Sequence, residues 1–182
     1  MQSRARKPAV ALDEDSLYNS AVKLLGQQMR TVAELTRVLR RRVEPGEAGD
    51  AKIEAVVARL KERKYLNDSS YAQEYARLRQ ENARFGKRRV QQDLMRKGVP
   101  GEVIGKTLDA AYEGVNEEGL ARQHLEHKRV KKPATEKEAA RVARMLLRAG
   151  FGSGTIFKIL KQWDTGDETL QALEGEEAEF RD

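Results

Sequence analysis

Few side chains in this sequence could catalyse a reaction or hold a metal ion. The chain has no cysteine and two histidines, His124 and His127, three residues apart on an expected helix. Zinc takes about four protein ligands at structural sites, and two imidazoles without cysteines or suitably spaced carboxylates do not supply them. No acidic pair stands in an apolar setting typical of a general acid. We interpret both histidines as partly exposed helix residues, and we predict no enzyme activity, no metal and no cofactor.

A glycine-rich segment, Gly150-Phe151-Gly152-Ser153-Gly154-Thr155, invites comparison with phosphate-binding loops. A dinucleotide-binding loop follows a strand, and a P-loop ends in Gly-Lys followed by Ser or Thr. Here a helical pattern precedes the segment, and no lysine follows its last glycine. We therefore interpret it as a turn between two helices.

Basic residues form three runs whose chemistry is easier to assign. Cations near a helix C-terminus complement the helix dipole, which explains one or two residues per helix but not runs of four to six. Repeated cationic patches bind phosphates by releasing counterions, and an acidic protein surface would serve as well. The candidate binding residues are Arg37, Arg40, Arg41, Arg42, Arg84, Lys87, Arg88, Arg89, Arg96, Lys97, Lys128, Arg129, Lys131 and Lys132.

The net charge of +6 is unevenly distributed. Residues 164–182 contain eight acidic residues and one arginine, a net charge of −7, so the other 163 residues carry +13. A body this basic favours an anionic partner. We expect the acidic segment to matter little to folding, and one hypothesis is that it competes with DNA for the basic body. No apolar run reaches the roughly 18 residues of a membrane span, and no signal-peptide core follows the basic start, so we expect a cytoplasmic protein without membrane contact.

An internal repeat organises the chain. Residues 90–99 (VQQDLMRKGV) align with residues 142–151 (VARMLLRAGF) at an offset of 52, and the match continues without a gap to Trp163. An earlier copy begins at Leu35, 55 positions before Val90. After an interruption it continues at Ile53, 51 positions before Ile104. We place the four extra residues in the turn around residues 45–49, because turns accept insertions.

Each copy reads as three helices, because apolar residues recur at helical spacing and strict alternation is absent. Thr31 and Thr135 each precede a glutamate by three residues, as in a capping box, and Pro100 fits a first helical turn. Gly98 and Gly150 follow helical stretches at equivalent places. The expected helices are residues 16–29, 31–42, 51–64, 67–84, 87–97, 101–113, 116–130, 136–149 and 154–163.

The predicted fold class is therefore all-α, with three tandem three-helix repeats that resemble helix-turn-helix units. The expected divisions are a flexible basic N-terminus (1–14), repeat 1 (15–66), repeat 2 (67–114), repeat 3 (115–163) and an acidic, disordered tail (164–182).

Several motifs resemble the RecX family of bacterial recombinase regulators. The similarity covers about residues 15–163 and includes residues 30–35 (RTVAEL), 60–72 (LKERKYLNDSSYA), Gly86, Arg89, Leu94 and residues 97–99 (KGV). Its most specific element is Tyr65-Leu66-Asn67-Asp68 followed by Tyr71-Ala72. The sequence departs from the usual pattern at Lys64, where Gly is common, at Asn67, where Asp is common, and at Tyr71, where Phe is common.

The resemblance implies an elongated, curved array that binds the RecA filament on single-stranded DNA. Family members typically block filament extension or promote disassembly, which lowers ATPase activity and strand exchange in recombination and SOS repair. RecA and, more weakly or through the filament, single-stranded DNA are thus the expected partners of a monomer. Two alternatives stay open: a helix-turn-helix protein that binds nucleic acid without RecA, and an adaptor for another protein.

The family motif has a structural interpretation of its own. Asn67 or Asp68 can cap the following helix, and Tyr65 and Leu66 can pack back on it as a hydrophobic staple. We therefore expect the motif to form the joint between repeats 1 and 2. The residues assigned a structural role are Tyr65, Leu66, Asp68, Tyr71, Gly86 and Gly98.

Overall fold

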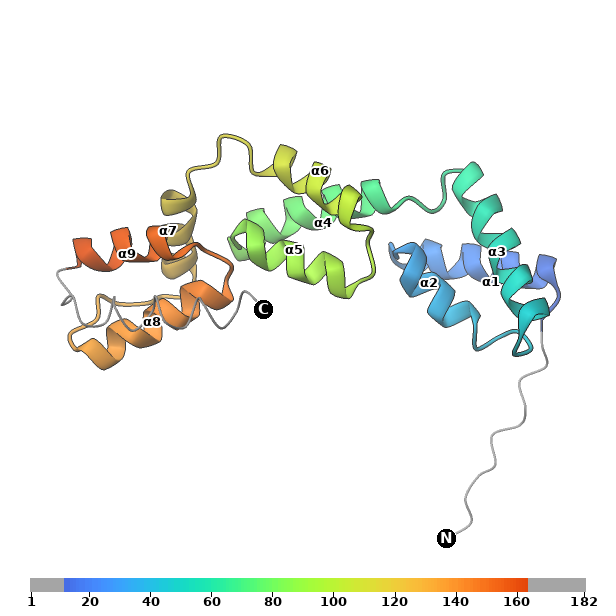
Figure 1. Cartoon of the computed structure of the whole chain (residues 1–182), viewed down its shortest axis with the longest axis horizontal. Coiled ribbons are helices and arrows are strands. Elements are labelled where there is room, and N and C mark those ends of the chain that lie inside the picture. The colour runs from blue at the N-terminus through green and yellow to red at the C-terminus, as the bar shows by residue number, and fades with distance from the viewer. Residues whose placement is uncertain (1–11, 164–182) are drawn as a thin grey trace, which may run out of the picture.

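The computed structural model describes residues 12–163 of the chain. Within this range it contains nine helices and no strand, which confirms the all-α class. Figure 1 shows three bundles in a row along a long, curved axis. The helices are α1 (Glu14–Gln27), α2 (Val32–Leu39), α3 (Glu47–Glu62), α4 (Asp68–Ala83), α5 (Lys87–Arg96), α6 (Gly101–Ala111), α7 (Glu117–His127), α8 (Glu136–Arg148) and α9 (Ser153–Gln162).

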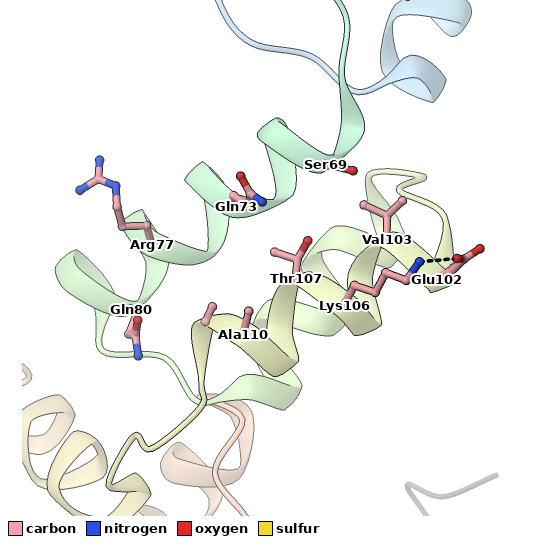
Figure 2. A pocket seen from close by; sticks show the side chains of 10 residues that line it. Ser69, Gln73, Arg77, Gln80, Glu102, Val103, Lys106, Thr107 and Ala110 are labelled. Atoms are coloured by element: carbon pink, nitrogen blue, oxygen red, sulfur yellow. Dashed lines mark hydrogen bonds and ion pairs between the residues drawn. The ribbon is translucent and has the colours of Figure 1, made fainter.

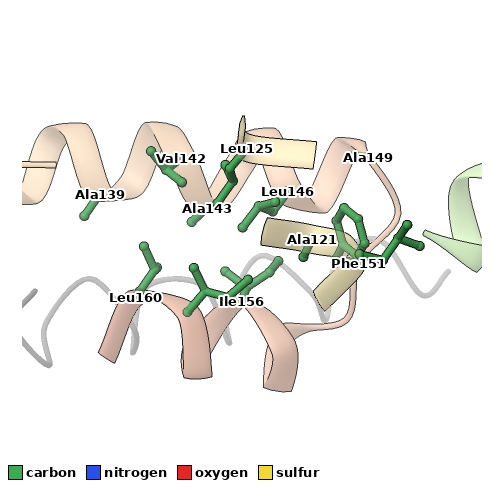
Figure 3. Close-up of a cluster of buried hydrophobic side chains, with 12 residues drawn as sticks. Ala121, Leu125, Ala139, Val142, Ala143, Leu146, Ala149, Phe151, Ile156 and Leu160 are labelled. Carbon is green, nitrogen blue, oxygen red and sulfur yellow. The ribbon is translucent and has the colours of Figure 1, made fainter. Parts of the chain in front are cut away.

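Each repeat encloses its own apolar core. Leu17, Leu35 and Leu60 are fully buried in repeat 1, and Val90 and Leu94 are fully buried in repeat 2. The third core, drawn in Figure 3, lies between α7, α8 and α9. Burying one such side chain contributes about 1.5–3 kcal/mol, so each small core stabilises its bundle mainly through a handful of residues.

The first turns of the helices confirm most of the expected caps. Thr31 forms a complete capping box with Glu34 at the start of α2. The Asn67 carboxamide oxygen accepts hydrogen bonds from the backbone N–H groups of Ser69 and Ser70 and so caps α4. Thr135 caps α8 as expected, but the capping box there is incomplete, because the Glu138 carboxylate accepts from the N–H of Ala134 instead.

Repeat 1 departs from two sequence expectations. Helix α2 ends at Leu39, so Arg40, Arg41 and Arg42 lie beyond its last residue. Helix α3 starts at residue 47 rather than 51, so the extra residues lengthen its N-terminal end as well as the turn before it. Gly49 permits this arrangement, because a Cβ atom there would lie 1.9 Å from the carbonyl oxygen of Glu44.

The repeats are joined through the ends of their second helices, α2, α5 and α8. The Gly86 N–H before α5 donates to the carbonyl of Ala149 after α8, at 2.9 Å. The Thr31 hydroxyl before α2 donates to the carbonyl of Lys97 after α5, at 2.7 Å. Thr31 and Gly86 are equivalent at the offset of 55, and Lys97 and Ala149 are equivalent at the offset of 52. The two joints therefore connect equivalent positions, with a side-chain hydroxyl as the donor at Thr31 and a backbone N–H at Gly86.

The same geometry recurs at the outer end of repeat 1. Arg42 is the equivalent of Lys97 at the offset of 55, and its carbonyl accepts a hydrogen bond of 2.9 Å from the N–H of Leu12. Leu12, two residues before α1, thus occupies the position that a neighbouring repeat would take. Residue 12 was expected to belong to a mobile end, but it is tied to the fold. Residues 1–11 and the acidic segment 164–182 were also expected to be mobile, and they lie outside the described residues.

Candidate interaction surface

The joint between repeats 1 and 2 is polar. It includes Lys97, which was predicted from the sequence to bind a partner. The Lys97 ammonium group lies 2.9 Å from the Glu34 carboxylate across the joint. Burial by itself would lower the pKa of Lys97, but Tyr71 and Glu34 outweigh burial and raise the pKa above its ordinary value. The Asp68 carboxylate accepts from the N–H of Val32 at 2.9 Å. Lys97 and Asp68 therefore hold the two repeats together.

The family motif contributes unequally to this joint. Leu66 is buried in the core of repeat 1, and Tyr71 is buried in the core of repeat 2. Tyr65 is 57% exposed, so the expectation that it packs back as part of a staple is wrong. Gly98 has a φ of +76°, and a Cβ atom there would lie 2.4 Å from the Cβ of Ala33 in the neighbouring repeat. Gly98 therefore permits the close approach of α5 to α2.

The joint between repeats 2 and 3 is aromatic and largely buried. His124 is 2% exposed, so the interpretation of this histidine as partly exposed is wrong, whereas His127 is exposed. The Nδ1 atom of His124 lies 2.8 Å from the carbonyl oxygen of Ala83, and its ring lies 5.9 Å from those of Phe85 and Phe151. Burial lowers the pKa of His124 below its ordinary value, against the opposing effect of the hydrogen bond.

The glycine-rich segment lies at this second joint. Gly150 has a φ of +89°, and a Cβ atom there would lie 2.3 Å from the backbone nitrogen of Arg89. The N–H of Gly152, at the start of α9, donates to the Glu117 carboxylate at 3.0 Å. An anion-binding helix end would need this N–H free, so the geometry agrees with an inter-helix turn.

Of the four arginines in repeat 1 that were predicted to bind a partner, two have side-chain contacts within the fold and two do not. Arg40 lies 3.1 Å from Asp50, and Arg42 donates to the Ser20 hydroxyl. Arg37 and Arg41 are exposed, and neither guanidinium has a hydrogen bond or ion pair with the described residues. These two are therefore available to a partner.

Predicted cations of repeat 2 are mostly engaged within the fold. Lys87 lies 2.7 Å from Asp109. The carboxylate of Asp93, 8% exposed, binds the Arg96 guanidinium and lies 3.3 Å from Nε of Arg89. Arg89 also places its guanidinium 5.5 Å from the centre of the Phe85 ring, so it belongs to the second joint. The remaining predicted cations of this repeat are Arg84, at the end of α4 with a φ of +53°, and the exposed Arg88.

Predicted cations of repeat 3 lie in the segment after α7. Lys128, Arg129, Lys131 and Lys132 are all exposed. None has an ion pair with a carboxylate of residues 12–163. This segment therefore presents four cations to solvent that no carboxylate of the described residues neutralises.

A second set of cations in repeat 3 was missed by sequence reasoning that searched for contiguous runs. Lys137, Arg141, Arg144 and Arg148 follow one another at spacings of four, three and four residues, which places them on one face of α8. All four are exposed, and none pairs with a carboxylate of the described residues. We call them the α8 stripe. The repeat offset could have found part of it, since Arg148 and Arg141 are equivalent to Arg96 and Arg89.

A groove of about 680 Å³ lies between α4 and α6, as Figure 2 shows. Its polar lining includes Ser69, Gln73 and Gln80, and Thr107 lies on the opposite helix. The cations at its edges are neutralised, since Arg77 lies 2.7 Å from Glu74 and from Glu81, and Lys106 lies 2.7 Å from Glu102. The groove therefore offers amide and hydroxyl groups rather than a charge to a ligand.

Residues 12–163 contain no cluster of three or more His, Cys, Asp or Glu side chains arranged to hold a metal ion. None of their helices has the length and apolar character needed to cross a membrane.

Comparisons with known proteins give this arrangement a family. Residues 67–108 match the family description "RecX, second three-helix domain". The regulatory protein RecX of Myxococcus xanthus is 37% identical over 157 residues, which cover 79% of this chain and 83% of that protein. The regulatory protein RecX of Leptothrix cholodnii is 34% identical over 149 residues, which cover 82% and 90%.

Solved structures agree on the fold. The crystal structure of RecX from Lactobacillus salivarius superposes with a TM-score of 0.67 at 21% sequence identity, over 83% of this chain and 96% of that one. Another crystal structure of regulatory protein RecX gives the same TM-score over 82% of this chain. With three tandem three-helix repeats and relatives of this identity and coverage, the chain belongs to the RecX family of regulatory proteins.

Proposed function

We propose that this protein regulates the RecA recombinase, mostly negatively, by binding the RecA filament on single-stranded DNA. In this proposal it acts as a cytoplasmic monomer that limits filament extension or promotes disassembly. The cognate RecA then hydrolyses less ATP and exchanges strands more slowly, which lowers recombination and the SOS response. Contact with DNA is weak or occurs through the filament.

One observation carries the proposal: the second helices of the three repeats run head to tail, and an exposed cation lies at an equivalent position at or just beyond the C-terminal end of each. Arg41, Arg96 and Arg148 are related by the offsets of 55 and 52, and all three are exposed. An array of repeats spreads its contacts over a long, regular target, and a nucleoprotein filament is such a target. The positive charge suits the phosphates and acidic surfaces that such a filament presents.

The deciding experiment measures the DNA-dependent ATPase of the cognate RecA while this protein is titrated into preformed filaments. We expect inhibition at substoichiometric amounts, because one bound array that stops extension affects many RecA subunits. No inhibition by an equimolar, correctly folded sample would refute the proposal.

The binding surface can be tested separately from the fold. The variant R41E/R148E reverses exposed cations at equivalent positions of repeats 1 and 3 and should weaken filament binding by more than about tenfold at moderate salt. Arg96 and Arg89 are left intact, because Arg96 binds the Asp93 carboxylate and Arg89 belongs to the second joint. A matched control, K23E/K61E, makes the same charge change in repeat 1 away from these positions. Equal loss in both variants would mean that net charge, not this surface, governs binding.

The α8 stripe favours a second candidate, binding of nucleic acid without RecA. Its residues are all lysine or arginine, which contact phosphates, and it carries no Asn or Gln to read base edges. This candidate predicts salt-sensitive and sequence-independent DNA binding by the protein alone, together with no effect on RecA ATPase beyond competition for DNA. Inhibition that persists when DNA is in large excess would exclude it as the main activity.

A further inference from the structure

The α8 stripe is an unusual concentration of unpaired charge. Its four cations stand at i, i+4, i+7 and i+11 on one helix face, and like charges at this spacing destabilise a helix. Repeat 2 relieves such repulsion with internal carboxylates, as in the pair of Lys87 with Asp109. No described carboxylate does so for the stripe. The stripe is therefore open to an anion from outside residues 12–163.

The chain leaves repeat 3 beside this helix. Helices α8 and α9 pack against each other, and Figure 3 shows Leu160, near the end of α9, opposite Ala139 in the first half of α8. Trp163 packs against the same core. The described part of the chain therefore ends close to the end of α8 that bears Lys137 and Arg141.

The sequence that follows has the complementary charge. Residues 128–148 contain eight basic and two acidic residues, a net charge of +6, and residues 164–182 carry −7. A chain of 19 residues spans up to about 60 Å, whereas α8 with its 13 residues is only about 20 Å long. Length therefore does not prevent the acidic residues from reaching every cation of the stripe.

We propose that the acidic segment 164–182 docks in cis on the α8 stripe and competes there with an anionic partner. Bound in this way, its carboxylates neutralise the four cations that no described residue neutralises. An approaching phosphate backbone or acidic protein must displace the segment before it contacts α8. The docking does not depend on the proposed function, whereas its effect on filament binding does.

Docking can be measured on the full chain by paramagnetic relaxation in NMR. Because the chain has no cysteine, Ala178→Cys gives a single site for a spin label. We expect the label to broaden the backbone amide signals of Arg141, Arg144 and Arg148 but not those of Gln73 on α4. The broadening should disappear near about 1 M salt, where screening is strong. Equal broadening of the signals from α4 and α8, or broadening that does not change with salt concentration, would overturn the docking.

Two variants and a mixing control identify the contact. Replacing the eight acidic residues of 164–182 by their amides should abolish the broadening, as should R141Q/R144Q/R148Q. The matched variant K23Q/K61Q/K64Q loses the same charge in repeat 1 and should keep the broadening. Circular dichroism checks that helicity is unchanged. Broadening that appears only when labelled and isotope-enriched chains are mixed would assign the contact to a second copy and refute docking in cis.

Competition is tested with a fluorescent oligodeoxythymidine as the anionic probe. The amide variant of the acidic segment should bind it about tenfold more tightly than the unmodified chain at low salt, and the two should converge as salt rises. Equal affinity at low salt would overturn the competition. These measurements contain no RecA, so their failure is distinguishable from failure of the ATPase experiment.

Discussion

The two joints of this array share a backbone geometry and differ in side-chain chemistry. Between repeats 1 and 2 the contacts are polar: the Thr31 hydroxyl binds a carbonyl, and Lys97 pairs with Glu34. Between repeats 2 and 3, Gly86 and Gly150 bring backbone against backbone, and His124 is buried beside two phenylalanine rings. Equivalent backbone positions therefore fix the path of the array, while the side chains decide how each joint responds to salt and pH.

The backbone contact at Gly150 in the second joint predicts the largest effect. Gly150→Ala should destabilise the protein by about 3 kcal/mol, because the new Cβ atom meets the backbone of Arg89 at 2.3 Å and the φ of +89° disfavours alanine. Urea unfolding measures this change. Gly105→Ala, in an open helical site, is the control and should stabilise slightly. A similar small effect at both glycines would contradict the close packing of the second joint.

The equivalent change in the first joint should cost less. Gly98→Ala places its Cβ atom 2.4 Å from a side-chain atom, the Cβ of Ala33, which has more freedom to shift than backbone. We expect a loss of about 2 kcal/mol. Adding Ala33→Gly should recover part of it, so a double-mutant cycle measures the coupling. An additive cycle would show that the two residues do not meet.

The charged pair of the first joint should make it sensitive to salt. Lys97→Met should cost about 1 kcal/mol, because the partly buried Glu34 carboxylate loses its partner. The difference between this variant and the unmodified protein should shrink as salt rises. Lys106→Met removes a highly exposed ion pair and should change little. A salt-independent difference would assign the loss to packing alone.

The buried histidine of the second joint should make it sensitive to acid. Because the folded-state pKa of His124 lies below the unfolded value of about 6.5, the unfolded chain binds the proton more readily. Stability is therefore fully present above that value and declines as the pH falls through the folded-state pKa. His124→Gln should flatten the pH dependence of the urea midpoint, whereas His127→Gln should preserve it. Unchanged pH dependence in His124→Gln would place the titrating group elsewhere.

The smallest effect concerns the segments that link the repeats. Residue 64, at the exit of repeat 1, is a lysine with a φ of +61°, whereas the exit of repeat 2 uses Gly114 with a φ of +66°. Lys64→Gly should stabilise the protein by about 0.5 kcal/mol, because glycine adopts this conformation without strain. Gly114→Ala is the reciprocal change and should destabilise. Thermal unfolding that moves in the same direction for both would contradict this account.

The sequence by itself determined the helices, because helical spacing, caps and the offset of 52 depend on local chemistry and on the repetition of one unit. Leu35, Val90 and Val142 occupy equivalent core positions, and all three are buried as their apolar character predicts. Sequence also identified Gly86 and Gly98 through the family pattern. The distribution of charge between the basic body and residues 164–182 follows from counting alone.

Only the tertiary structure decided which charges stay available. The sequence pattern predicts that Lys97 and Arg89 are free to bind a partner. In the structure Lys97 pairs with Glu34 of the neighbouring repeat, and the Arg89 guanidinium lies over the Phe85 ring at the second joint. His124 is buried because residues 83–85 of the preceding repeat cover it, a contact across about 40 positions that local pattern does not encode. The spacing of the α8 stripe follows from the helix expected over residues 136–149, but only the packing of α8 shows that its four cations are exposed and have no partner among the described carboxylates. Burial and pairing depend on contacts between repeats, so they follow from the packing of the array rather than from any one segment.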